Sequence, residues 1–197
     1  MQRQKGVHLT MKEVEAVMRQ AKAESSRNHC MFLMGYLHGL RAQELADLRL
    51  EDITSDGVLH VERRKGSMFT HQPLMKWKGN VLMDEVRALK VWLKDRDSDS
   101  TAMFTSSKTG GHLTREQVSR AFHACAERAG LPPEKRYVHI LKHSVATHCC
   151  EQDMNIMDIK QLLGHSALSS TMVYSHTNDT RAVKAAMTAL QSYSRTI

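Results

Sequence analysis

The sequence predicts an α+β domain in which helices dominate and one small antiparallel sheet supplies the strands. Apolar residues recur every three or four positions through most of the chain, which is typical of helices. One alternating run, residues 58–64, is followed after Lys65-Gly66-Ser67 by a second extended run, residues 68–75, which indicates a hairpin. The chain has 197 residues, of which 41% are hydrophobic, enough for one sizeable core. We therefore expect a single domain over residues 1–197.

The N-terminal third predicts three helices. Thr10 and Glu13 form a capping box, and apolar residues then recur at helical spacing to Glu24. Residues 30–40 are apolar nearly all round, which predicts a buried helix that ends at Gly39. Arg41 is expected to start a third, short helix.

The middle of the chain contains the hairpin and one further helix. Pro73 lacks a backbone N–H, so it belongs on an edge strand and limits the sheet to two or three strands. Apolar residues between positions 81 and 93 predict the helix, which ends in the polar run 95–101. This run is too short to separate two domains.

The second half predicts a series of helices. Thr114 and Gln117 form another capping box, for a helix that runs to Gly130 and is stopped by Pro132-Pro133. Short helices are then expected at residues 139–152, 156–163, 170–175 and 181–190.

Composition and charge exclude several classes of protein. No apolar run is long enough to span a membrane, and Met1 is followed by Gln-Arg-Gln-Lys rather than by a secretory or organellar targeting segment. The four cysteines contain no CxxC pair and two of them are adjacent, which does not favour a disulfide framework. We expect a cytoplasmic protein with reduced thiols. The net charge of +7 is typical of a protein that meets a polyanion.

Residues 139–176 concentrate the groups that could perform chemistry: His139, Lys142, His143, His148, His165, Tyr174 and His176. His139 and His143 have the i, i+4 spacing of a zinc-binding helix, but the glutamate of an HExxH motif is missing and Lys142 would place a cation beside the metal. A hydrogen-bonded core histidine is therefore favoured for His143. The alternative chemistry is phosphoryl transfer, with a tyrosine hydroxyl as nucleophile and with cations and imidazoles that neutralise a phosphodiester. This chemistry needs no metal or cofactor.

Four separated sequence blocks resemble the tyrosine recombinase, or phage integrase, family. They are Gly39-Leu40-Arg41-Ala42-Gln43-Glu44-Leu45, His139-Ile140-Leu141-Lys142-His143-Ser144-Val145-Ala146-Thr147-His148, Leu162-Leu163-Gly164-His165 and Thr171-Met172-Val173-Tyr174-Ser175-His176. The resemblance extends from Leu9 to about Leu190 and covers the catalytic domain of the family, without a separate N-terminal core-binding domain. In this respect the chain is most similar to the short fimbrial-switch invertases of enteric bacteria.

The resemblance implies a role for each matching residue. Tyr174 would attack the scissile phosphate and form a 3′-phosphotyrosine bond, while Arg41 and His165 hold the phosphate oxygens. His139 would accept the tyrosine proton, and Lys65, at the tip of the hairpin, would protonate the departing 5′-oxygen. The resemblance thus implies a site-specific DNA recombinase for DNA integration, excision or inversion, of the kind carried by mobile elements.

One position departs from the family pattern. The second arginine of the family falls at Lys142, and a lysine cannot make the two parallel bonds of a guanidinium. If the second bond acts in the transition state, its loss would cost about 2–4 kcal/mol, or about 30- to 1,000-fold in rate. A DNA-binding transcriptional regulator with a recombinase-like fold and weak or lost catalysis is therefore the alternative. A type IB topoisomerase-like enzyme, which shares the nucleophile chemistry, is a third candidate.

The resemblance also implies partners. The expected partner is double-stranded DNA, bound by a homo-tetramer on paired recombination sites, with accessory DNA-bending proteins as further partners, in the nucleoid of a bacterial cell. Glu44, one helical turn after Arg41, would orient that arginine. The tail helix within residues 181–197 would either be exchanged between subunits or pack on its own domain.

Overall fold

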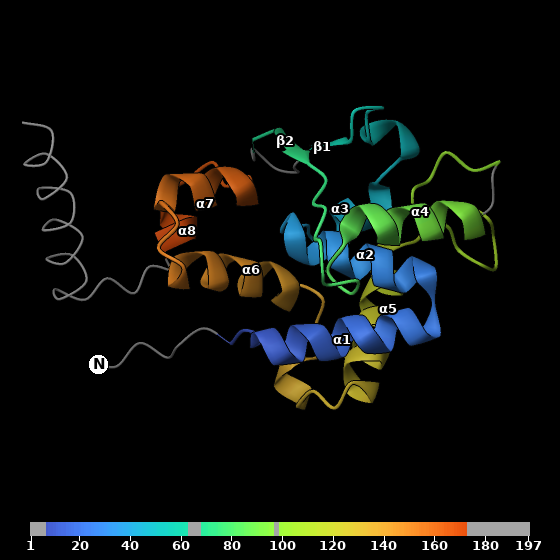
Figure 1. Cartoon of the computed structure of the whole chain (residues 1–197), viewed down its shortest axis with the longest axis horizontal. Coiled ribbons are helices and arrows are strands. Elements are labelled where there is room, and N and C mark those ends of the chain that lie inside the picture. The colour runs from blue at the N-terminus through green and yellow to red at the C-terminus, as the bar shows by residue number, and fades with distance from the viewer. Residues whose placement is uncertain (1–6, 63–67, 97–98, 173–197) are drawn as a thin grey trace, which may run out of the picture.

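The computed structural model describes residues 7–62, 68–96 and 99–172, and it confirms a mainly helical fold with a small antiparallel sheet (Figure 1). The elements in chain order are α1 (Met11–Glu24), α2 (Ser26–Leu37), α3 (Ala42–Asp47), the 3-10 helix η1 (Leu50–Asp52), β1 (Val58–Val61), β2 (Thr70–Pro73), α4 (Glu85–Asp95), α5 (Arg115–Arg128), the 3-10 helix η2 (Pro133–Lys135), α6 (Ile140–Glu151), α7 (Ile156–Leu163) and α8 (Ser169–Met172). Among these helices, none has the length and apolar character that crossing a membrane requires.

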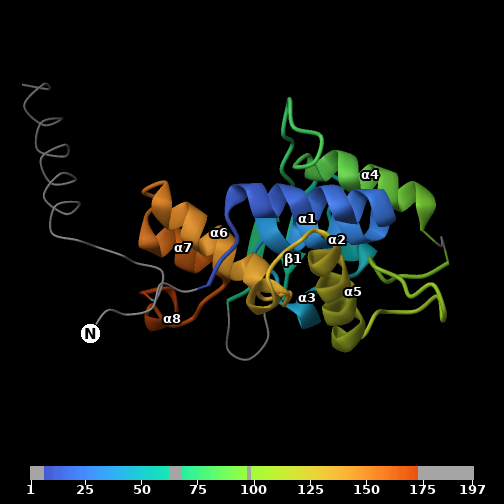
Figure 2. The same cartoon turned by 90° about the horizontal axis from the view of Figure 1, so that it is seen from below.

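Helix α2 forms the centre of the core. Every residue from Asn28 to Leu37 is buried, because α1, α4 and α6 all pack against this helix. Helix α5 joins the core through Phe122, whose ring meets Phe32 of α2 edge-on at a centroid distance of 5.2 Å. In Figures 1 and 2, α7 and α8 lie at one end of the molecule, and α4 and α5 lie at the other.

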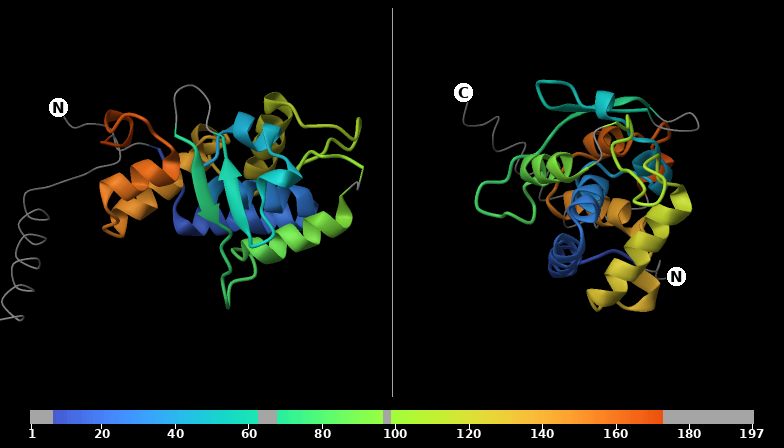
Figure 3. Two further views of the ribbon diagram at one scale, coloured as in Figure 1. Left: turned by 90° about the horizontal axis from the view of Figure 1, so that it is seen from above. Right: turned by 90° about the vertical axis from the view of Figure 1, so that its right-hand side faces the viewer.

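The hairpin lies across the central helices and beside α7 (Figure 3). Strands β1 and β2 pair antiparallel, with Val58 opposite Pro73 and Val61 opposite Thr70. Pro73 therefore occupies an edge strand, as its missing N–H requires. Leu59 and Val61 face the core, so one side of the hairpin is anchored in it.

Several helix boundaries differ from those expected. Helix α4 begins at Glu85 rather than near Val81, because the side chain of Asp84 caps it by accepting a hydrogen bond from the backbone of Arg87. Helix α2 begins at Ser26, four residues before the expected start, because Ser25 caps it and accepts from the backbone of Asn28. Local apolar spacing did not reveal either cap.

Some expected features lie outside the described residues. These are the hairpin tip with Lys65, the end of the helix expected at residues 170–175, Tyr174, His176 and the tail helix at residues 181–190. The four cysteines are all described and none of them is in a disulfide; three are buried.

Candidate active site

Arg41 lies at the start of α3 and is oriented by Glu44. A carboxylate oxygen of Glu44 accepts from the backbone N–H of Arg41 at 2.8 Å, and the other accepts from Arg41 Nη1 at 2.8 Å. The Glu44 side chain is 2% exposed, whereas that of Arg41 is 35% exposed. The buried carboxylate therefore fixes the direction of the guanidinium, and solvent or a ligand can still reach the arginine. This contact is the one expected for Glu44.

The turn that carries Arg41 is held close to the end of α7. Gly39 has a φ of +58°, and a Cβ atom added there would lie 2.7 Å from Cδ2 of Leu163. Glycine is favoured at this position because both the left-handed backbone and the close approach penalise a side chain. The approach brings the turn before Arg41 against the helix end that leads into His165.

His165 follows α7 directly and is almost fully buried. Gly164 ends α7 in the left-handed conformation, with a φ of 65°, which turns the chain toward α8. Nδ1 of His165 lies 3.0 Å from Oγ1 of Thr171 in α8, and the histidine is 8% exposed. The ring is therefore oriented by a buried hydroxyl rather than left to rotate at the surface.

His139 occupies the N-cap position of α6, where its ring meets that of His143 edge-on at 4.6 Å. Burial is the largest of the causes that lower the pKa of His139 from 6.5 to about 4, and the nearby His143, Lys142 and Arg41 act in the same direction. His139 is thus neutral near pH 7 and able to accept a proton. Burial also lowers the pKa of His143.

Lys142 is buried within α6 and points at two backbone carbonyls. Its side chain is among the largest fully buried ones, and the residue is 1% exposed. Nζ donates to the carbonyl oxygen of Gly39 at 2.9 Å and to that of Leu163 at 2.7 Å. The structure thus places this cation between the two segments that lead into Arg41 and His165.

The described residues do not support the zinc alternative for His139 and His143. Within residues 7–62, 68–96 and 99–172, the three-ligand group close enough to hold a metal ion consists of His8, His148 and Glu151, none of which lines the cleft described next. His139 and His143 do not belong to it.

A cleft of about 930 Å³ opens beside Arg41 and His139. It is bounded by the start of α3, by one face of α5 and by the segment that leads into α6, and its polar lining includes Arg41, Arg115, Ser119, Arg120, His123 and Arg136. Arg136 is paired with Glu127 at 2.6 Å. The cleft is therefore cationic, and Arg41 and His139 lie on its wall.

The α5 residues of this cleft were not among those singled out from the sequence. Arg115, Ser119 and His123 are spaced i, i+4 and i+8, which puts them on one face of the helix. That polar spacing was the only local signal they carry. What was missing was any indication that this face of α5 is turned toward Arg41.

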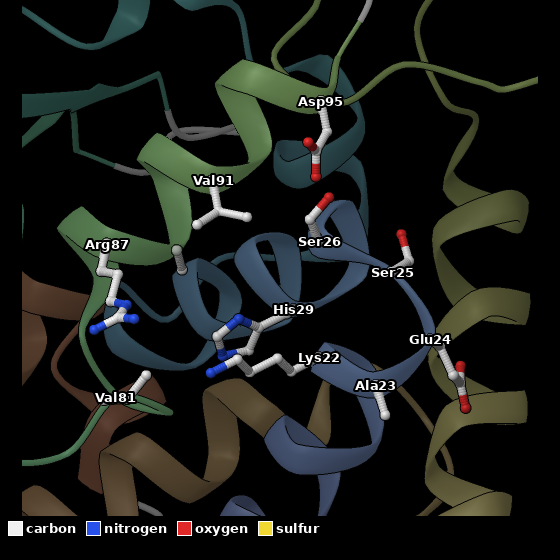
Figure 4. A pocket seen from close by; sticks show the side chains of 11 residues that line it. Lys22, Ala23, Glu24, Ser25, Ser26, His29, Val81, Arg87, Val91 and Asp95 are labelled. Carbon is white, nitrogen blue, oxygen red and sulfur yellow. The ribbon is translucent and has the colours of Figure 1, made fainter.

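A second cavity, of about 340 Å³, lies where the turn between α1 and α2 meets α4 (Figure 4). Lys22 and His29 line it from α1 and α2, and Arg87, Val91 and Asp95 line it from α4. It shares no lining residue with the cationic cleft. Nε2 of His29 lies 2.9 Å from the carbonyl oxygen of Leu82, and burial lowers the pKa of this histidine. The cavity is thus separate from the candidate site.

Comparison with known proteins identifies the family. The profile of the phage integrase family matches residues 8–181. The chain belongs to the phage integrase family. This membership confirms the resemblance of the four sequence blocks.

Two relatives show how similar this chain is to characterised members of the phage integrase family. It is 34% identical over 182 residues to tyrosine recombinase XerC of Erythrobacter litoralis (strain HTCC2594), covering 89% of this chain and 56% of that protein. It is 29% identical over 181 residues to the type 1 fimbriae regulatory protein FimE of Escherichia coli (strain K12), covering 88% of this chain and 87% of that protein. The chain thus spans just over half the length of XerC and most of the length of FimE.

Solved structures support the same fold. The crystal structure of XerA recombinase has a TM-score of 0.75 at 22% identity, covering 95% of this chain and 66% of that one. The pre-cleavage complex of XerH site-specific recombinase with its difH substrate has a TM-score of 0.73 at 22% identity, and the match covers 94% of this chain and 55% of the XerH chain. These likenesses show the tyrosine recombinase fold in this phage integrase family chain.

Proposed function

We propose that the chain is the catalytic domain of a site-specific recombinase that cuts and rejoins DNA through a 3′-phosphotyrosine intermediate. The observation that carries the proposal is the cationic cleft with Arg41 and His139 on its wall, in a chain of the phage integrase family. The chain spans 56% of XerC, so the activity, the substrate and the partners are all part of the proposal.

Arg41 and His165 are proposed to bind the scissile phosphate. A guanidinium makes two parallel charge-assisted hydrogen bonds to phosphate oxygens, and Glu44 already holds that of Arg41 in one orientation. His165, oriented through Thr171, would support the same phosphate by hydrogen bonding. Such preorganised donors stabilise the charge that develops on the phosphate as the nucleophile attacks.

His139 is proposed to accept the proton of the Tyr174 hydroxyl. Its low pKa makes it the free base near pH 7, as a proton acceptor must be. The cations that lower this pKa would be offset by a bound phosphodiester, which would make His139 a stronger base when DNA is present.

The proposed reaction balances without a metal or cofactor. The Tyr174 oxygen forms a bond to phosphorus, its proton passes to His139, and the bond from phosphorus to the 5′-oxygen breaks. Lys65 would give a proton to that departing oxygen. The free 5′-hydroxyl can later attack the phosphotyrosine bond and reverse the step, so the energy of the broken bond is retained.

Double-stranded DNA is the proposed partner. Arg115 and Arg120 on α5 extend the positive wall of the cleft beyond Arg41, as binding to a phosphate backbone requires. XerH, which has a similar fold, was crystallised with its difH substrate, and this supports a comparable partner for the present chain. A homo-tetramer on paired sites, accessory DNA-bending proteins and a tail helix exchanged between subunits extend the proposal.

Covalent capture tests the proposal even while the target site is unidentified. Wild type and Tyr174→Phe are expressed in cells that carry the native DNA, the cells are denatured, and DNA still attached to protein is recovered and sequenced. Tyr193→Phe is the matched control, since it removes the same hydroxyl from another tyrosine of the C-terminal segment.

The expected result is recovery of one DNA sequence with wild type and Tyr193→Phe and none with Tyr174→Phe. Recovery of many unrelated sequences would favour topoisomerase-like relaxation. Tight, reversible DNA binding without any covalent product would contradict the recombinase proposal and favour a regulator.

A further inference from the structure

The last turn of α7 is held by groups from two other parts of the chain. The final carbonyls of a helix have no partner within it. Here the carbonyl oxygen of Leu162 accepts from Nε2 of Gln72 in β2 at 2.9 Å, and that of Leu163 accepts from Nζ of Lys142 at 2.7 Å. The backbone N–H of Met68 donates to the carbonyl oxygen of Gly164 at 3.3 Å. Three successive carbonyls before His165 are thus fixed by α6 and by the returning strand of the hairpin.

Lys142 links this turn to the turn before Arg41. Its Nζ also donates to the carbonyl oxygen of Gly39, two residues before Arg41, at 2.9 Å. Both carbonyls lie at or just beyond the C-terminal end of a helix, where the partial negative charge of the helix favours a cation. A buried ammonium is costly unless it is hydrogen-bonded, so these bonds are what makes the position tolerable for lysine.

Gln72 continues the connection in the other direction. Its Nε2 donates to the Leu162 carbonyl, and its Oε1 lies 2.7 Å from Nδ1 of His38. Nε2 of His38 lies 2.6 Å from a carboxylate oxygen of Glu85, whose other oxygen accepts from the backbone of Met75. A buried polar chain therefore runs from the start of α4 through the end of α2 and strand β2 to the end of α7.

We infer that Lys142 is a positioning residue, which fixes the turn before Arg41 and the turn before His165 relative to each other in the DNA-free protein. Gln72 connects the hairpin to the last turn of α7 through its hydrogen bond to the Leu162 carbonyl. This role differs from the phosphate contact that the position of Lys142 in the family motif implies. This inference rests on the proposed function only for the roles of Arg41 and His165 in phosphate binding. The hydrogen bonds of Lys142 to the Gly39 and Leu163 carbonyls, which we call the Lys142 brace, need no DNA.

The geometry also explains how lysine serves at this position. The three protons of an ammonium diverge from one atom, so a single Nζ can reach carbonyls that belong to two different segments. A planar guanidinium presents its donors as a wider fork, which matches the paired oxygens of a carboxylate or a phosphate.

Nuclear magnetic resonance of the DNA-free protein tests the inference. With ¹⁵N-labelled lysine, we expect an ammonium resonance whose protons exchange slowly with water, which is absent from Lys142→Met and present in the control Lys94→Met. Lys94 is the matched control because it is an exposed lysine of α4. If Lys142→Met does not fold, cross-peaks from the ammonium to protons of Gly39 and Leu163 in the wild type make the same assignment.

Amide hydrogen exchange supplies the second measurement. In Lys142→Met, exchange at Leu40 and at His165 should rise together by about tenfold or more relative to Leu33 in the centre of α2. The ¹⁵N signal of the His165 ring should shift as well. A uniform rise at all amides would mean a general loss of stability and would overturn the positioning role.

Two other results would overturn the inference. One is an ammonium of Lys142 that exchanges as fast as that of Lys94, and the other is unchanged exchange at Leu40 and His165 in Lys142→Met. Because these measurements use no DNA, failure of covalent capture would count against the proposed function alone.

Discussion

Replacing Gly39 by alanine measures how much the close approach between the Arg41 turn and the end of α7 matters. Two costs add at this site. The φ of +58° costs an alanine about 1–2 kcal/mol, and its Cβ would lie 2.7 Å from Cδ2 of the buried Leu163, so repacking costs about 1–3 kcal/mol more. The expected loss in free energy of unfolding is about 2–4 kcal/mol, since the leucine methyl can move slightly.

The matched control is Gly130→Ala. Gly130 also has a positive φ, of +78°, but a Cβ there would meet nothing within 4 Å. Only the backbone cost applies, about 1–2 kcal/mol. Since each kcal/mol lowers the melting temperature of a domain of this size by about 2–4 °C, Gly39→Ala should melt about 4–16 °C below the wild type and Gly130→Ala about 2–8 °C below it.

Thermal unfolding followed by circular dichroism, at one pH and one salt concentration, is the assay. The difference between the two variants isolates the contact with Leu163, because the backbone cost is common to both. If Gly39→Ala is no less stable than Gly130→Ala, the two segments do not abut as described, and the brace through Lys142 loses its geometric basis.

Three further predictions concern charge. The pKa of His139 is lowered from 6.5 to about 4, so as the pH falls the unfolded chain binds this proton before the folded protein does. The free energy of unfolding of the wild type should therefore fall between pH 6.5 and pH 4. In urea titrations over this range, His139→Gln should lose less stability than the wild type. Arg41→Ala should lower covalent capture by about 10²- to 10³-fold, and it should also lower the melting temperature because the buried Glu44 carboxylate loses its guanidinium partner. Arg19→Ala, on the exposed face of α1, should capture like the wild type, and equal capture by both variants would refute the phosphate role. Arg115→Ala and Arg120→Ala should each reduce the slope of log binding constant against log salt by about one in fluorescence anisotropy, whereas slopes equal to that of Arg19→Ala would exclude them from the DNA surface.

The helix boundaries that were predictable from the sequence are set by residues that lie close together in the sequence. The capping boxes at Thr10 and at Thr114 place the starts of α1 and α5 where the structure has them, because each box is made within four residues. Helix α7 likewise begins and ends at Ile156 and Leu163 as expected. The starts of α2 and α4 were misplaced because Ser25 and Asp84 cap them outside the apolar pattern.

The candidate site was predictable only as a set of residues. The motif blocks indicated that Arg41, His139, Lys142 and His165 belong together. In the structure Arg41 and His139 line one cleft, and Lys142 bonds to the carbonyls of Gly39 and Leu163, two residues before Arg41 and His165. The cationic face of α5 was not predicted, because the spacing of Arg115, Ser119 and His123 shows a shared face and not what that face meets.

The sequence by itself determined the fold class, most helix boundaries and the family, because these depend on local caps, apolar periodicity and ordered motifs. Only the tertiary structure decided where the Lys142 ammonium goes. Its two carbonyl partners are 103 and 21 residues away in the chain, and no periodicity relates them. Their meeting depends on how α2, α6 and α7 pack, and the packing of a core is a property of all its side chains together.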